Sequence, residues 1–288
     1  MNKYLLSLFI IVCVSRFACA AQTEAYLNDS VFEADPYFLL MGEAEDAIKE
    51  QNWPEAAARL SDALGVKPNH PSNALVLYNL AKVYSCIGND TLAVATYNRG
   101  LDIAPNMTVL YLGRGKTYLN MGKQKSAFDD FEHVIKLDSL STEARYLHGM
   151  ISLYGGNMKG AEADFNVLES VAPKSFDTAI ALATLYSMTG RERKAIPYFE
   201  RIIETEPTAE YYAALAGCHL ALNELTEASE VLGEAMIAYP KDAELYYYRA
   251  RLNRDRFRND DARRDAERAI ELGANPVKVN ELFKSNKH

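Results

Sequence analysis

Apolar and polar residues follow the period of an α-helix along the middle of the chain. One apolar stripe runs at spacings of three and four residues and consists of Leu77, Leu80, Ala81 and Tyr84. The sequence Gly88-Asn89-Asp90 then breaks the pattern, because glycine and asparagine favour turns. A second stripe follows the break and is made of Ala93, Tyr97 and Leu101. This stretch predicts two amphipathic helices joined by a tight turn.

The same pair of helices recurs along the chain, as a set of regularly spaced alanines indicates. They lie 33, 34 or 37 residues apart and are Ala56, Ala93, Ala127, Ala161, Ala195, Ala228 and Ala262. Twelve residues before each stands a second small residue, in the series Ala44, Ala81, Gly115, Gly149, Ala183, Ala216 and Ala250. Four residues after each comes a residue that is large in all but the last case, in the series Leu60, Tyr97, Phe131, Phe165, Phe199, Leu232 and Ala266. Seven copies of one unit therefore fill about residues 37–276.

Each place in the unit has a physical reason. The paired small residues allow two helices to approach closely, and the large residue fills the space beside them. A proline closes most units, because its ring disfavours helical geometry in the residue before it. These prolines are Pro68, Pro105, Pro173, Pro207 and Pro240. The first and last units diverge most, as the two ends of a stack require.

This pattern resembles the tetratricopeptide repeat family, whose unit is a helix-turn-helix of about 34 residues. The resemblance implies an all-α fold, a right-handed superhelical solenoid of about seven helix-turn-helix repeats. The repeats are expected at residues 37–70, 74–107, 108–141, 142–175, 176–209, 209–242 and 243–276, with a C-terminal cap or tail at 277–288. Two repeats carry Arg145 and Ala179 where the family has a large aromatic residue, so looser packing is expected there.

The sequence Gly113-Arg114-Gly115-Lys116-Thr117 invites comparison with a phosphate-binding loop. A Walker A loop needs Gly-x-x-x-x-Gly-Lys-Ser/Thr, and Leu110 stands where its first glycine should be. Gly115 is also the small residue of the third repeat, which places Lys116 in mid-helix rather than at a loop-to-helix junction. The repeat accounts for these residues, and a nucleotide site is not expected.

The N-terminus has the pattern of a cleaved signal peptide at residues 1–20. Lys3 precedes an apolar run from Leu5 to Val14, and Ala18-Cys19-Ala20 supplies the small residues that signal peptidase recognises. The run is too short to span a bilayer. Cleavage after Ala20 is therefore predicted, which leaves residues 21–36 as an N-terminal linker and exports the protein to the periplasm or the medium. A lipoprotein signal, with a lipid anchor on Cys19, is the alternative.

The composition argues against several classes of function. A net charge of −8 argues against a broad nucleic-acid surface, which requires clustered basic residues. Cys86 and Cys218 are the cysteines certain to remain after cleavage, too few for a disulfide framework. The five histidines include no pair four residues apart, and no Cys-x-x-Cys occurs, so neither a metal site nor a cofactor is expected. Paired carboxylates such as Asp129-Asp130 are interpreted as a solvated face, and no catalytic constellation is recognised.

The seventh repeat contains eight arginines between Arg249 and Arg268. An anionic partner is one interpretation of this cluster. Five acidic residues interleave with the arginines, however, and mixed-sign faces are common solvated surfaces. A polar cap over the end of the stack is therefore the preferred interpretation.

In this family the first helix of each repeat lines a concave groove that holds peptides or other proteins. The resemblance places the partner-binding groove at Tyr78, Lys82, Leu112, Lys116, Leu119, Tyr146, Met150, Tyr154 and Met188. Its tyrosines are expected to be exposed, because a hydroxyl prefers water or a partner, whereas Leu112 fits a buried position equally well. Lys82 and Lys116 occupy the same place in successive repeats, so they should lie side by side and receive a carboxylate.

These observations predict a non-catalytic, exported scaffold that binds a protein or peptide partner in its groove. The alternative is an accessory subunit of a cell-envelope assembly complex, lipid-anchored in one version, that binds through its edges or convex face. An enzyme with a cryptic active site is a third class, and the repeat leaves few residues unexplained for it. The basic set used by chaperone-tail-binding members of the family is absent, so that function is not inferred.

Overall fold

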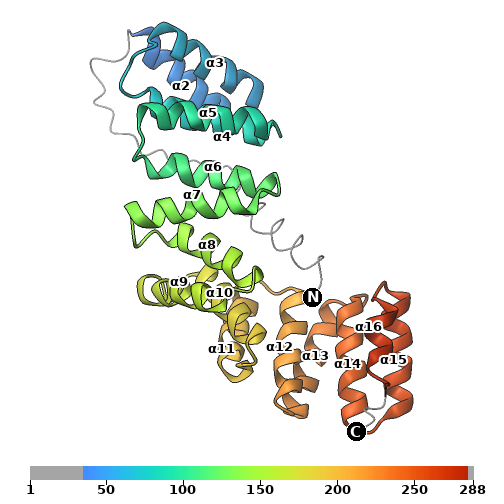
Figure 1. Cartoon of the computed structure of the whole chain (residues 1–288). Helices are drawn as coiled ribbons and strands as arrows, with labels where there is room; N and C mark the ends of the chain where they lie inside the picture. The colour runs from blue at the N-terminus through green and yellow to red at the C-terminus, as the bar shows by residue number, and fades with distance from the viewer. Residues whose placement is uncertain (1–34, 285–288) are drawn as a thin grey trace. The chain divides into compact units, whose positions relative to one another are not determined.

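The computed structural model describes residues 35–284, so the expected signal peptide, Cys19 and nearly all of the expected linker lie outside the described residues. Regular structure in the described part is entirely helical. The chain divides into two compact units, one ending at Gly155 and the other beginning at Gly156. We call these the first unit and the second unit (Figure 1).

Within residues 35–284, the helices follow one another in seven pairs and a short final helix. The pairs are α2 (Pro36–Lys49) and α3 (Trp53–Val66), α4 (Asn73–Cys86) and α5 (Asp90–Ile103), α6 (Thr108–Asn120) and α7 (Gln124–Leu137), α8 (Thr142–Tyr154) and α9 (Met158–Val171), α10 (Phe176–Met188) and α11 (Glu192–Thr205), α12 (Ala209–Ala221) and α13 (Leu225–Ala238), and α14 (Ala243–Asp255) and α15 (Asn259–Glu271), and the final helix is α16 (Pro276–Glu281). The first unit contains α2 to α8 and the second α9 to α16. Within the first unit, α3 packs on α4, α5 on α6 and α7 on α8, so successive hairpins lie side by side (Figure 1).

The small residues that define the repeat are buried where helices meet. All seven of the regularly spaced alanines are 0% exposed. Gly115 illustrates the constraint, because a Cβ built on it would lie 2.6 Å from Cε1 of Phe131. Gly113 faces the Tyr97 ring just as closely, with 2.6 Å from its ideal Cβ position to Cζ. Glycine at these two positions therefore sets how near α6 can come to α7 and to α5.

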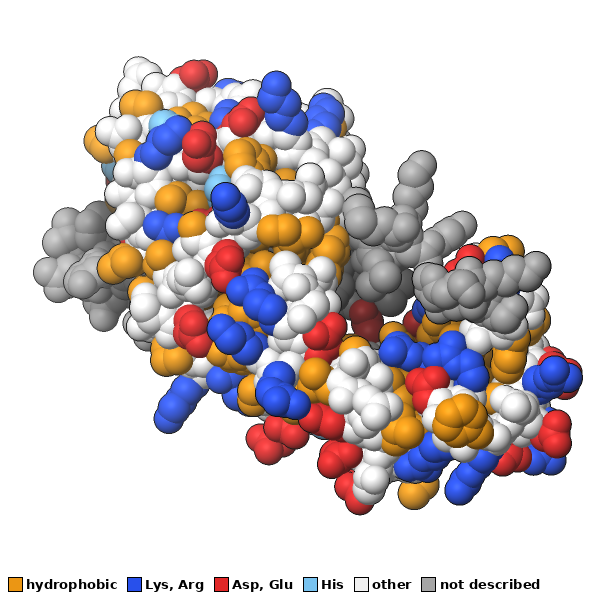
Figure 2. Space-filling model, turned by 60° about the horizontal axis from the view of Figure 1, so that its bottom comes forward, with side chains coloured by type: hydrophobic (Ala, Val, Ile, Leu, Met, Phe, Trp, Pro, Cys, Tyr) orange, Lys and Arg blue, Asp and Glu red, His pale blue; other side chains and the backbone are white. Residues whose placement is uncertain are grey.

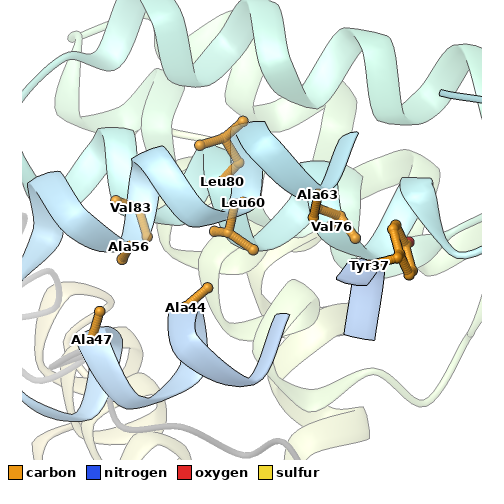
Figure 3. Close-up of a cluster of buried hydrophobic side chains, with 9 residues drawn as sticks. All are labelled: Tyr37, Ala44, Ala47, Ala56, Leu60, Ala63, Val76, Leu80 and Val83. Atoms are coloured by element: carbon orange, nitrogen blue, oxygen red, sulfur yellow. The ribbon is translucent and has the colours of Figure 1, made fainter. Parts of the chain in front are cut away.

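The first hairpin and α4 enclose one apolar core. It consists of Tyr37, Ala44, Ala47, Ala56, Leu60, Ala63, Val76, Leu80 and Val83 (Figure 3). Tyr37 is fully buried, and its hydroxyl donates a hydrogen bond to Oδ1 of Asn73 at 3.0 Å. Asn73 in turn donates to the carbonyl oxygens of Lys67 and Pro68, at 2.7 and 2.9 Å. The buried polar atoms of this layer thus hold the loop between the first two hairpins against the core.

One residue in each hairpin turn has a positive φ. These residues recur with the spacing of the repeat and are Gln51, Gly88, Gly122, Gly156, Gly190, Asn223 and Phe257. Glycine and, to a lesser degree, asparagine accept this left-handed conformation, which costs other residues about 1–2 kcal/mol. Phe257, with φ 58°, is a bulky residue at a position that favours glycine.

The second unit ends in a small helix that covers the seventh hairpin. Val279 and Leu282, at 0% and 8% exposure, pack in a cluster with Ala250, Ala266 and Ala269. These three alanines belong to α14 and α15, whose surfaces would otherwise be apolar and open to water. Helix α16 therefore closes this end of the second unit.

Candidate functional site

The sequence from Gly115 to Thr117 lies inside α6 rather than in a loop. Gly115 is buried against Phe131, and Thr117 is buried with its hydroxyl donating to the carbonyl oxygen of Gly113 at 3.0 Å. Lys116 is half-buried in the same helix. This geometry confirms the repeat interpretation of the segment and excludes a phosphate-binding loop there, because the backbone N–H groups are part of the helix.

The structure distributes the nine predicted groove residues over four helices. Tyr78 and Lys82 lie half-buried on α4, and Leu112, Lys116 and Leu119 lie half-buried on α6. On α8, Tyr154 is half-buried, whereas Tyr146 and Met150 are buried. Met188, at the end of α10, is 37% exposed and belongs to the second unit. The accessible predicted residues of the first unit are therefore those on α4 and α6, together with Tyr154 on α8.

The expected exposure of Tyr146 is wrong. This side chain is 2% exposed and Met150 7%, so both are core residues. The fourth repeat carries Arg145 at the usual aromatic place, and the Arg145 guanidinium donates to the carbonyl oxygen of Ser139 at 2.6 Å instead of packing inside. Tyr146 is the aromatic side chain that is buried there. Its ring contributes more to the core than its hydroxyl would gain from water.

The two lysines that were expected to act together have different partners. Lys116 forms an ion pair with Glu143 of α8. The Nζ atom of Lys82 lies 5.4 Å from the centroid of the Tyr78 ring, and Lys82 has no ion pair within residues 35–284. Lys82 is half-buried, so its charge is only partly solvated. Of the two, Lys82 is the lysine that is free to receive a carboxylate from outside.

Lys82 lies among other accessible side chains on the first helices of the second and third repeats. Helices α4 and α6 pack against each other, and the hydroxyls of Ser85 and Thr117 are 3.0 Å apart between them. Leu75, 39% exposed, and Cys86, also exposed, flank Lys82 along α4. We call this surface the α4–α6 face, and its members are Leu75, Tyr78, Lys82, Cys86, Leu112, Lys116 and Leu119. It combines apolar contact area with Lys82, a cation that has no ion pair within residues 35–284.

Elsewhere on the surface, charge is finely mixed. On the side drawn in Figure 2, hydrophobic side chains are scattered among basic and acidic ones instead of forming one broad patch. Surfaces of this kind are typical of solvated protein exteriors. A functional surface is therefore expected where charge and apolar area combine locally, as they do around Lys82.

The arginine-rich seventh repeat is paired internally. Arg249 donates to Asp265 through Nε and Nη2, at 2.9 and 2.5 Å, and Asn253 donates to the same carboxylate at 2.8 Å. Arg254 donates to the carbonyl oxygen of Leu282 at 3.1 Å, which ties α14 to the end of α16. These bonds agree with the polar-cap interpretation, because the arginines donate their hydrogen bonds to groups within the second unit.

Besides Tyr198, whose pKa is raised by burial and by its hydrogen bond to Glu169, three groups in the second unit have strongly raised pKa values. Burial raises the pKa of the Cys218 thiol to about 12. The pKa of Tyr212 rises to about 12 because its hydroxyl donates to Glu234, at 2.7 Å, and because it is desolvated. Burial also raises the pKa of Tyr248 to about 12. All three therefore stay protonated at neutral pH, and Cys218 lacks the thiolate that a reactive cysteine requires.

The described residues lack two further features, a metal-binding cluster and a membrane-spanning helix. Between residues 35 and 284, no group of three or more His, Cys, Asp or Glu side chains is placed to hold a metal ion. None of the helices in that range has the length and apolar character needed to cross a membrane.

Sequence reasoning missed two residues that the structure makes prominent. Glu143 neutralises Lys116, and it is the second residue of the fourth repeat, the place that Leu75 has in the second repeat. Phe257 is 89% exposed in the last hairpin turn. The sequence could have singled out Phe257, because the repeat spacing aligns it with glycines in four other turns.

The fold thus defines a protein built of repeated helical hairpins. Models of the tetratricopeptide repeat match residues 41–108 and 180–243 and residues 109–139. These ranges cover more than half of the chain, which belongs to the tetratricopeptide repeat family.

The chain is similar to proteins of different lengths. The tetratricopeptide repeat and J domain-containing co-chaperone DNJ1 of Cryptococcus neoformans is 27% identical over 143 residues, which are 49% of this chain and 27% of that protein. The chain therefore spans about a quarter of the length of that relative. A tetratricopeptide repeat protein from Parabacteroides merdae superposes with a TM-score of 0.62 at 22% identity, over 86% of this chain and 98% of the other. YrrB, a tetratricopeptide repeat protein with an unusual peptide-binding site, gives a TM-score of 0.59 at 18% identity, over 67% of this chain and 99% of YrrB.

Proposed function

We propose that the chain is a non-catalytic scaffold that binds an extended segment of a protein partner on the α4–α6 face. The observation that carries this proposal is the environment of Lys82. This residue is a half-buried lysine with no ion pair within residues 35–284, next to the ring of Tyr78 and the exposed Leu75. A partly desolvated cation is stabilised when a carboxylate binds it, so the face favours a ligand that brings one.

The neighbouring groups define the rest of the ligand. Leu75 and Leu112 offer apolar contact, and Tyr78 is a residue type that is frequent at binding hot spots. Lys116 is already neutralised by Glu143, so a ligand with a single acidic group suits the face better than a run of several. The peptide-binding site of the structural neighbour YrrB supports the proposal by analogy of fold alone.

Export is part of the same proposal. A signal peptide at residues 1–20 would deliver the scaffold to the periplasm or the medium, where its partner would be an envelope or secreted protein. N-terminal sequencing of the chain purified from cells tests this step. A mature chain that starts at Ala21 supports export, and a retained Met1 contradicts it.

A second candidate, an accessory subunit that docks through an edge, rests on a different observation. The last residues of α3, α5 and α7 are Val66, Ile103 and Leu137, at 47%, 49% and 42% exposure. They occupy the same place in three successive repeats of the first unit, so they mark one edge of it. An edge of exposed aliphatic residues suits contact with a neighbouring subunit.

Binding of selected peptides separates the two candidates. Peptides with free C-termini would be selected from a displayed library on the purified chain, and their affinities measured by calorimetry. Lys82→Glu should weaken the selected peptide at least about tenfold, because attraction becomes repulsion. Lys136→Glu, on α7, is the matched charge reversal and should change affinity less than about twofold. Equal binding by Lys82→Glu and the parent chain would remove the α4–α6 face from consideration, and loss through Ile103→Asp would favour the edge.

A further inference from the structure

The last hairpin turn holds an aromatic side chain at a position that disfavours it. Phe257 has φ 58°, and the equivalent turn positions are Gln51, Gly88, Gly122, Gly156, Gly190 and Asn223. Glycine adopts this left-handed conformation without strain, whereas a bulky side chain crowds the backbone. Two of the seven turns thus carry a residue other than glycine or asparagine, Gln51 in the first and the bulkier Phe257 in the last.

Folding gives no reason for this side chain. Phe257 is 89% exposed, so its ring contributes almost nothing to a core. The turn is held by backbone bonds that any residue would make, from Phe257 N–H to the Arg254 carbonyl at 2.9 Å and from Arg258 N–H to the Asn253 carbonyl at 2.8 Å. A strained residue that stabilises nothing within residues 35–284 indicates a contact made outside them, and a partner is one source of it.

The charges around the ring limit the kind of contact. Arg256 is tied down, donating to the carbonyl oxygen of Leu225 at 2.7 Å and to the Ser229 hydroxyl at 3.2 Å. Arg258 and Asp260, in contrast, are exposed and form no ion pair within residues 35–284. Phe257 is therefore followed closely in the chain by one exposed positive and one exposed negative side chain, neither in an ion pair within residues 35–284.

We propose that this turn is a self-association surface, at which Phe257 of one copy of the chain packs against Phe257 of a second copy. A two-fold contact brings the same patch together from both sides, so the patch must be complementary to itself. Arg258 and Asp260 meet that condition, because Arg258 of each copy can pair with Asp260 of the other. A rim of a single sign would instead repel its own copy.

The predicted dimer is weak. Two phenyl side chains bury roughly 300–500 Å² between them, whereas stable complexes bury at least about 1,200 Å². The contact should therefore form and dissolve with concentration, and sedimentation equilibrium of the purified chain up to about 1 mM is the appropriate measurement.

Phe257→Gly separates binding from stability. Glycine removes both the ring and the strain, so this variant should dimerise at least about tenfold more weakly and yet melt at a higher temperature. A merely structural Phe257 would move the melting temperature down instead. Ile237→Ala removes an aliphatic side chain that is 85% exposed elsewhere in the second unit, and it should leave dimerisation unchanged.

A charge exchange tests the pairing itself. Arg258→Asp and Asp260→Arg should each weaken the dimer, and the double variant should restore it, because the exchanged charges again meet their opposites across the two-fold axis. A monomeric parent chain at about 1 mM overturns the proposal. So does unchanged dimerisation of Phe257→Gly, or a double variant as weak as the two single ones.

Discussion

Gly115 of α6 lies directly against the ring of Phe131 in α7. The ideal Cβ position of Gly115 is 2.6 Å from Phe131 Cε1 and 3.0 Å from Cζ. Phe131 is fully buried, so its ring has little freedom to move away. The close approach of these two helices therefore depends on the absence of a single methyl group.

Gly115→Ala should destabilise the chain although alanine favours helices. The new methyl group would force the Phe131 ring aside, and overpacking typically costs about 1–3 kcal/mol, from which a helix-propensity gain of about 1 kcal/mol must be subtracted. We expect a net loss of up to about 2 kcal/mol in denaturant unfolding. Gly42→Ala is the matched control, because a Cβ there meets no atom within 4 Å, and it should stabilise α2. Equal effects of the two variants would show that the Phe131 contact is soft.

The ion pair between Arg114 and Asp130 should be worth more than a surface pair. Arg114 donates through Nε and Nη2 to the two carboxylate oxygens, at 2.9 and 2.6 Å, and Asp130 is 5% exposed. Arg114→Ala leaves a buried carboxylate without its partner, so we expect a loss of about 2–4 kcal/mol, and Arg114→Lys should recover only part of it. Replacement of both residues by alanine should cost less than the sum of the two single losses. Simple additivity in this double-mutant cycle would argue that the pair is not coupled.

Val279 and Val277 offer a comparison within one short helix. Val279 is 0% exposed in the cluster that covers α14 and α15, whereas Val277 is 65% exposed. Val279→Ala should lower the stability of the second unit by about 2 kcal/mol, because it leaves a cavity among the alanines of this cluster. Val277→Ala removes the same atoms from the solvent side and should stay within about 0.5 kcal/mol. Thermal melts of both variants test whether α16 functions as a cap, and equal small losses would contradict it.

The second unit should lose stability in alkali. Cys218, Tyr212 and Tyr248 all have pKa values raised to about 12, from ordinary values of 9.0 for the thiol and 10.0 for the hydroxyls. A raised pKa means that the folded chain holds the proton more tightly, so the stabilisation is complete below the ordinary value and is lost as the pH rises towards 12. Tyr248→Phe removes one ionisable hydroxyl and should move the midpoint of alkaline unfolding upward, as followed by circular dichroism. Tyr78→Phe, in the first unit, should leave that midpoint unchanged.

The hairpin fold could be predicted from the sequence because its determinants are local. Spacings of three and four residues define one apolar face on each helix, and glycine or asparagine ends it at a turn. The alanine series of the seven repeats also marks where helices must touch, and all of those alanines are indeed fully buried. A repeated pattern makes such an inference reliable, since each repeat tests the others.

The groove could be predicted only in part, because exposure depends on neighbours that are distant in sequence. Lys82 and Lys116 are equivalent in the repeat, yet Glu143 of the fourth repeat neutralises Lys116, whereas Lys82 has no ion pair within residues 35–284. Tyr146 matches Tyr78 in position, but Tyr146 is buried in the core. The neighbouring Arg145 instead donates a hydrogen bond to the carbonyl oxygen of Ser139. Periodicity assigns a residue to a face without saying how far the adjacent helices cover it.

The sequence by itself therefore determined the helical hairpins, their number, their close-contact residues and the absence of a phosphate loop at Gly115. Each of these follows from interactions within about one repeat, where spacing and residue size suffice. The tertiary structure alone decided which groove residues remain accessible, which lysine keeps an unneutralised charge, and that Phe257 stands in water. Those properties arise from side chains of different repeats meeting in space, and a linear pattern does not specify the distances between them.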